Sequence, residues 1–138
     1  MGSFLVDSYR VRVEVSRAGS PVVTTRVRML ELRSAMEFHG IVEQANLVFA
    51  SNWDSWSGSP VAGYYSTFNP LQPFLTCWLP SAEYPLFYDI VRSEKPVTLS
   101  YQELQGPQYV TPGGFYVSEV ALGTSTEPVG EGPADLSP

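Results

Sequence analysis

Apolar and polar residues alternate without interruption from Ser8 to Ser16. This period of two is typical of a strand with one buried face, and its apolar positions are Tyr9, Val11, Val13 and Val15. A second alternating stretch begins at Val22. Its phase slips where Met29 and Leu30 are both apolar, which predicts a bulge near Met29 or a second buried face. The residues between the two stretches, 17–21, include Gly and Pro, so the pattern predicts an antiparallel hairpin.

A helix is predicted over residues 35–50. Ser34 and Glu37 have the Ser-x-x-Glu spacing of a capping box, in which each side chain bonds the other residue's backbone N–H. Apolar residues then recur at the three- and four-residue intervals of an amphipathic helix, at Phe38, Ile41, Val42, Ala45, Val48 and Phe49. Gly40 within the segment disfavours the helix by about 1 kcal/mol relative to Ala.

The chain then alternates between short strands, turns and one further helix. Residues 51–60 have no hydrophobic period and are predicted to form a loop. Strands are expected at 61–68, 73–79, 97–102 and 115–122, separated by segments rich in Pro, Gly or Asn. The second helix is expected to begin within 80–83 and to end at 94–96, because Leu86 with Ile90 and Phe87 with Val91 form i, i+4 pairs.

These elements predict an α+β fold with the order ββαββαββ. We expect an antiparallel sheet or a small open barrel of about six strands, with two helices packed on one face or end. The globular domain is expected to span residues 1–122. Residues 123–138 are rich in Pro, Gly and acidic residues and have few apolar side chains, so they are predicted to form a flexible acidic tail.

Length and composition limit the classes of protein that the chain can belong to. The 138 residues are the length of one domain, and 43% of them are hydrophobic, as in ordinary globular proteins. The single Cys77 excludes an internal disulfide and any zinc site with several cysteines. No apolar run is long enough to span a membrane, and the N-terminus lacks the features of a signal peptide. We therefore expect a cytoplasmic protein.

The sequence contains no catalytic, metal-binding or phosphate-binding motif. His39 is the only histidine and is expected on the surface of the first helix. Cys77 lies in the middle of a predicted strand, where a small buried thiol is the ordinary interpretation. Acidic residues are scattered along the sequence and do not suggest a carboxylate pair for general acid–base catalysis. We expect no catalytic residue, no metal and no cofactor, and hence a protein that is not an enzyme.

Basic residues are concentrated near the N-terminus, where six of the eight lie within the first 33 positions. If the apolar faces of both hairpin strands point to one core, the opposite face carries Arg10, Arg12, Arg26 and Arg28. Such a face could bind a phosphate or carboxylate partner. It could equally be a solvated outer surface that Glu14 partly neutralises. The net charge of −6 argues against a nucleic-acid partner.

A second candidate surface is aromatic. Rigid aromatic side chains among small polar residues are typical of binding loops, and this group consists of Trp53, Asp54, Trp56, Tyr64 and Tyr65. The alternative is that both tryptophans cover the core where the loop folds back.

We therefore expect a non-enzymatic protein–protein interaction module, of the inhibitor or adaptor type, that binds another protein through this aromatic loop. One alternative is a domain that binds a carbohydrate or small molecule by stacking the same aromatics on its ligand. Another is recognition of an anionic partner by the arginines. The aromatics could also form a contact between two copies of the chain, so a homo-oligomer stays open.

Overall fold

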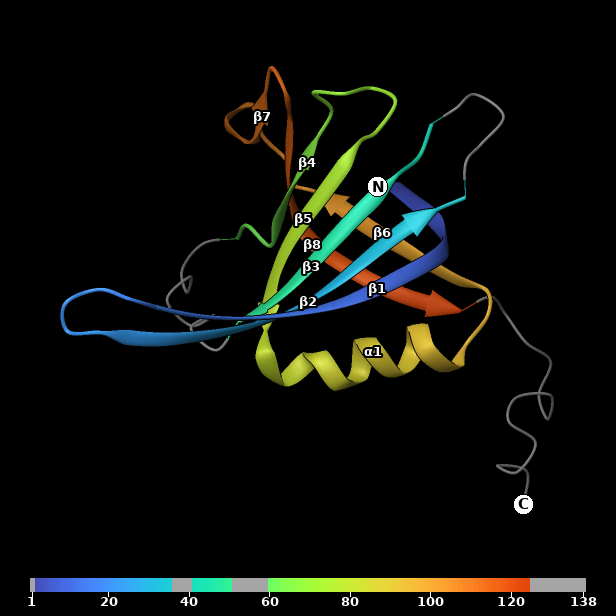
Figure 1. Ribbon diagram of the computed structural model, residues 1–138. Helices are drawn as coiled ribbons and strands as arrows, with labels where there is room; N and C mark the ends of the chain where they lie inside the picture. Colours follow the sequence, from blue (N-terminus) through green and yellow to red (C-terminus); the bar gives the residue numbers. More distant parts are fainter. Residues whose placement is uncertain (1, 36–40, 51–59, 125–138) are drawn as a thin grey trace.

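The computed structural model describes residues 2–35, 41–50 and 60–124 (Figure 1). The described part contains eight strands, one α-helix and two single-turn 3-10 helices. In chain order these elements are β1 (Gly2–Ala18), β2 (Val23–Ser34), β3 (Gln44–Ala50), β4 (Gly63–Ser66), β5 (Phe74–Pro80), η2 (Ser81–Glu83), α1 (Tyr84–Ser93), β6 (Val97–Glu103), η3 (Pro107–Tyr109), β7 (Val110–Thr111) and β8 (Gly114–Thr124).

Seven of the strands in the described part close into a ring. Their order is β4-β5-β3-β2-β1-β6-β8, and β4 also pairs with β8, so that the last strand meets the first. The two-residue strand β7 is added at the edge of β8. Strands β3 and β5 are parallel, whereas the other pairs are antiparallel. The sheet is therefore mixed and closed, which removes most of its exposed edges.

Alternating side chains of the ring strands fill its interior. On β3, Ala45, Leu47 and Phe49 are almost fully buried, and Leu30 and Leu32 of β2 are fully buried beside them. Helix α1 lies across one end of the ring (Figure 1). The ring of Phe49 meets those of Tyr84 and Phe87 edge-on, with centroids 5.3 and 5.5 Å apart. These aromatic contacts fix the helix to the end of the core.

The helix predicted at 35–50 is wrong for the part that the structure describes, because residues 44–50 form strand β3. Residues 36–40, which include Glu37 and His39, lie outside the described residues. The hydroxyl of Ser34 accepts a hydrogen bond from the N–H of Glu43 at 2.9 Å, and so supports the connection between β2 and β3. Pairing with β2 and β5 on its two sides overrides the weak helical spacing of this segment.

The predicted fold class is also wrong as a whole. A sheet of eight strands with one α-helix replaces six strands with two helices, and the order ββαββαββ does not hold. The first hairpin and the later helix were predicted correctly and correspond to β1–β2 and α1. Strand β8 extends through Gly123 and Thr124, which the sequence assigned to the tail, and residues 125–138 lie outside the described residues.

The phase slip near Met29 reflects a second buried face and not a bulge. The register of β1 and β2 runs without a break past Met29, and the shift occurs between Val6 and Ser8. Strand β2 is instead buried on both faces at this point, because Glu31 is 7% exposed between two fully buried leucines. The second of the two alternatives that the pattern allowed is therefore the one observed.

Candidate functional site: the β1–β2 arm and the pocket at its base

The β1–β2 hairpin projects well beyond the ring (Figure 1). Strand β6 pairs with β1 only from Gly2 to Val6, and β3 pairs with β2 only from Val27 to Arg33. Residues 15–26, here called the arm, therefore have no neighbouring strand on either side within the described part of the chain. On β1, the unpaired stretch is longer and covers Ser8–Ala18, here called the free edge.

Apolar side chains on this hairpin are open to solvent. Every residue of β1 from Asp7 to Ala18 is exposed. Between Asp7 and Arg26, the larger apolar side chains that are more than half exposed are those of Val13 (57%), Val15 (57%), Val22 (59%) and Val23 (58%). Val11, Val13 and Val15 alternate along β1 and form a row on one face of the ribbon, whereas Val23 lies on the other face, opposite Ala18. Such a row on a projecting ribbon is unusual for a surface in contact with water only.

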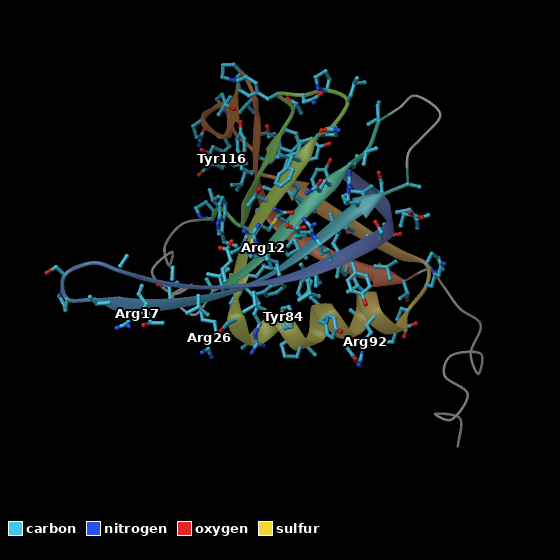
Figure 2. All side chains as sticks on the ribbon, in the orientation of Figure 1. Arg12, Arg17, Arg26, Tyr84, Arg92 and Tyr116 are labelled. Carbon is cyan, nitrogen blue, oxygen red and sulfur yellow. The ribbon has the colours of Figure 1, made fainter. Side chains whose placement is uncertain are left out.

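The strand register does not bring the four candidate arginines onto one face. Residues directly opposite each other in an antiparallel pair share a face. Arg28 lies opposite Val13, and Arg26 lies opposite Val15, so both share the face of the valine row. Arg10 and Arg12 lie on the other face, opposite Glu31 and Met29. Figure 2 shows Arg17 and Arg26 on the side of the hairpin nearer α1, and Arg12 on the opposite side.

Arg10 and Arg12, on the face away from the valine row, have carboxylate partners. The guanidinium of Arg10 donates to Glu31 at 2.6 Å, and that of Arg12 contacts Glu14 at 2.6 Å. Glu31 is nearly buried whereas Arg10 is largely exposed, so this pair mainly balances the charge of a carboxylate that the fold covers. Both guanidinium groups on this face are thus paired with carboxylates.

Arg26 and Arg28, on the face of the valine row, border a pocket at the base of the arm. Its volume is about 470 Å³, and its described lining consists of Thr24, Arg26, Arg28, Phe49, Ser81 and Ala82. The guanidinium of Arg28 lies over the ring of Tyr84, 5.2 Å from its centroid. No ion pair joins Arg26 or Arg28 to a described carboxylate. Two guanidinium groups, two hydroxyls and an aromatic ring therefore converge on one space of ligand size.

A row of side chains continues from this pocket along α1. The rings of Tyr84 and Tyr88 stack with centroids 5.7 Å apart, and Arg92 lies over Tyr88 at 5.5 Å. Burial raises the pKa of Tyr84, the neighbouring Tyr88 adds to this effect, and Arg28 opposes it. Tyr84 therefore stays a neutral hydrogen-bonding group beside the pocket at physiological pH.

The predicted aromatic surface is only partly described. Trp53, Asp54 and Trp56 lie outside the described residues, so their role stays a prediction. Tyr64 and Tyr65 fall on opposite faces of β4. Tyr65 is 9% exposed and stacks on Phe115 inside the ring of strands, with ring centroids 4.9 Å apart. The hydroxyl of Tyr64 is instead hydrogen-bonded to that of Thr111. The two tyrosines therefore do not share a binding surface.

Burial raises the pKa of the Cys77 thiol to about 12, so this thiol is protonated and enclosed at neutral pH. In the described ranges, no three His, Cys, Asp or Glu side chains are grouped closely enough to hold a metal ion. The one α-helix of the described ranges is too short to cross a membrane.

Sequence reasoning did not find the pocket, because its lining comes from β2, β3 and η2. Only the hairpin register could have indicated that Arg26 and Arg28 face the same side as the valines. Comparisons with family models, with curated proteins and with solved structures found no match to this chain.

Proposed function

We propose that the chain is a non-enzymatic protein–protein interaction module and that the β1–β2 arm is its contact surface. The observation that carries this proposal is the arm itself, a projecting two-stranded ribbon with exposed valines and no neighbouring strand among the described residues. Isolated two-stranded hairpins are at best marginally stable in water. A ribbon of this kind gains stability when a partner covers its apolar face or pairs with its edge.

The distribution of charge supports the same assignment. Arginine is enriched at the centres of protein interfaces, and the valine face of the arm is flanked by Arg26 and Arg28. Edge strands that must avoid association usually carry lysine, proline or a bulge. The stretch Ser8–Ala18 has neither lysine nor proline, and its register with β2 is regular. The edge therefore lacks lysine, proline and a bulge, three common features that prevent pairing with another chain.

Removing the arm tests this function. Residues 15–26 can be replaced by Asn-Gly, which makes a two-residue hairpin turn between the paired residues Glu14 and Val27. The pairing of β2 with β3 begins at Val27 and is kept, so the ring should still fold. The wild-type chain first captures a partner from lysate, and the complex is then formed again from purified components. We expect the arm variant to lose this complex. Retention of that complex at wild-type affinity would contradict the proposal.

A parallel variant locates the contact surface. Trp53→Ala combined with Trp56→Ala removes the aromatic side chains of the predicted binding loop and leaves the arm intact. Loss of the complex in the arm variant alone assigns the contact to the arm. Loss in the tryptophan variant alone assigns it to the loop instead. Circular dichroism of all three proteins provides the control for folding.

A second candidate function is recognition of an anion in the pocket at the base of the arm. The observation that favours it is the pair Arg26 and Arg28, which line a space of about 470 Å³ and have no described carboxylate partner. The hydroxyls of Thr24 and Ser81 supply further donors. Guanidinium groups bind carboxylate and phosphate oxygens through paired hydrogen bonds, so either group suits this pocket.

Thermal unfolding with added anions tests this second function. At constant ionic strength, we expect inorganic phosphate or citrate to raise the melting temperature of the wild-type chain, because a ligand of the folded state stabilises it. Arg26→Gln combined with Arg28→Gln should abolish the increase. Arg12→Gln is the matched control, since Arg12 lies on the other face and pairs with Glu14. Equal increases in all three proteins would indicate a general salt effect and would reject the site.

A further inference from the structure

We propose that the partner of the free edge is a second copy of this chain, joined by antiparallel pairing of the two β1 strands about a two-fold axis at Val13. This inference rests on the proposed function, because it names the partner of the same hairpin. The two hairpins would form one four-stranded sheet in the order β2, β1, partner β1, partner β2. An interface of this kind is isologous, so the same edge must complement itself.

The free edge fits this symmetry along its full length. Ser8–Ala18 contains an odd number of residues, and Val13 is its midpoint. Antiparallel pairing about Val13 places each residue opposite the one equally far from the midpoint on the partner. Every residue of this stretch is exposed, and β2 alone pairs with it in the described part of the chain. The backbone groups on the other side of β1 are thus available over about 35 Å of strand.

Charges along the edge are complementary under this symmetry. Arg12 would lie opposite Glu14 of the partner subunit, and Glu14 would lie opposite Arg12 of the partner subunit. Opposite charges directly across an antiparallel pair stabilise it, whereas like charges destabilise it. The same side chains already form an ion pair within one chain at 2.6 Å. The dimer would therefore assemble two such pairs into a cluster of four alternating charges.

The apolar face is complementary as well. Val11 would lie opposite Val15 of the partner subunit, and the two Val13 side chains would meet at the axis. Tyr9 would lie opposite Arg17 of the partner subunit, where a guanidinium can stack on a ring. The valines would then form a continuous strip of six, flanked on both sides by Arg26 and Arg28 of each β2. The strand rings of the two copies would lie near opposite ends of the joint sheet, because each arm extends away from the strand ring of its own chain.

Cysteine cross-linking tests the axis. In Val13→Cys the two introduced thiols would face each other at the cross-strand Cα spacing of about 4.5–5.5 Å, which a disulfide can bridge. Val23→Cys is the matched control, because Val23 is equally exposed, at 58% against 57%. Val23 pairs with Ala18, so the two control thiols would lie about 33 Å apart at opposite ends of the sheet. Native Cys77 is buried and does not compete.

Under a mild oxidant, we expect the Val13→Cys chain to become a disulfide-linked dimer and the Val23→Cys chain to form little disulfide-linked dimer at the same protein concentration. Equal rates of cross-linking in the two variants would reflect random collision and would overturn the proposed pairing.

Charge reversal tests the partner and the register together. Arg12→Glu and Glu14→Arg each place like charges opposite each other at two symmetric positions, so each should weaken the dimer by about tenfold in sedimentation measurements. An equimolar mixture of the two variants pairs acidic side chains at positions 12 and 14 of one chain with basic side chains at the same positions of the other. We expect the mixture to associate with an affinity near that of the wild-type chain. Neither variant can form the internal Arg12–Glu14 ion pair, so this rescue cannot arise within one chain.

Failure of this proposal is distinguishable from failure of the proposed function. A wild-type chain that stays monomeric at every concentration, or a mixture of the two variants that shows no rescue, overturns pairing between copies. If removal of the arm still abolishes a complex with another protein, the interaction function stands. If wild-type chains dimerise and the mixture of charge variants regains that affinity, the partner is the second copy.

Discussion

Replacing Phe49 by alanine is expected to lower the free energy of unfolding by about 4 kcal/mol, the range seen when a buried phenylalanine is truncated. Phe49 is 1% exposed and is among the largest fully buried side chains of the described core. Its ring meets Tyr84 and Phe87 of α1 at 5.3 and 5.5 Å. The substitution therefore opens a cavity between the ring of strands and its helix, and removes two aromatic contacts in addition to buried area.

Urea unfolding followed by circular dichroism measures this effect. Phe68→Ala is the matched control, since Phe68 is 88% exposed and its truncation should change the unfolding free energy by less than about 0.5 kcal/mol. A loss of less than about 1.5 kcal/mol for Phe49→Ala would show that α1 is not anchored through this side chain. Because Phe49 also lines the pocket, anion binding in the variant should be compared only under conditions where it is fully folded.

Local patterns in the sequence predicted the elements whose contacts are close along the chain. The alternation around Val13 correctly predicted β1, and the turn residues after it predicted the antiparallel partner β2. Helix α1 followed from its i, i+4 apolar pairs. These features are set by neighbouring residues, so a single sequence contains the information that they need.

The segment that forms β3 was misinterpreted because two periods overlap in it. Ala45, Val48 and Phe49 fit a helical spacing, whereas Ala45, Leu47 and Phe49 alternate and are the residues that the core buries. Leu47 did not belong to the predicted helical face and was the available signal for a strand. The choice between the two periods is made by pairing with β2 and β5, and β5 lies some thirty residues further along the chain.

The candidate site was predictable only in part, for a related reason. The arginines and valines of the hairpin were recognised as unusual, but the assignment of Arg26 and Arg28 to the face of Arg12 assumed a register. The turn sets that register, and a shift of one residue exchanges the two faces of a strand. The pocket needs three elements to come together, so no single segment of the sequence indicates it.

Gly63, which the sequence did not single out, allows β4 and β5 to approach closely. Gly63 begins β4, the four-residue strand that pairs with β5 on one side and β8 on the other. A Cβ at this position would overlap the backbone oxygen of Thr76 and lie 2.7 Å from the sulfur of Cys77. A backbone oxygen held in a sheet cannot move aside at low cost, so the neighbouring strands can approach only because the side chain is missing.

Gly63→Ala is therefore expected to lower the free energy of unfolding by about 3 kcal/mol, at the upper end of the overpacking range. Gly123→Ala in β8 is the matched control, because a Cβ there meets nothing within 4 Å and should change stability by less than about 0.5 kcal/mol. Urea unfolding of both variants measures the difference. Equal stabilities would show that β4 can shift to accept a methyl group.

Alkylation of Cys77 gives a local measure of the same change. The thiol lies opposite Gly63, is fully buried and has its pKa raised to about 12 by that burial. Displacement of β4 in Gly63→Ala would expose the thiol to water and bring its pKa back toward the ordinary value of about 8.5, which increases the fraction present as reactive thiolate. We expect alkylation at neutral pH to be much faster in Gly63→Ala than in Gly123→Ala. Slow alkylation of Cys77 in both variants, with a loss of stability in Gly63→Ala alone, would give a different result. The strain would then be spread over the whole ring of strands, and β4 would stay in place until the protein unfolds.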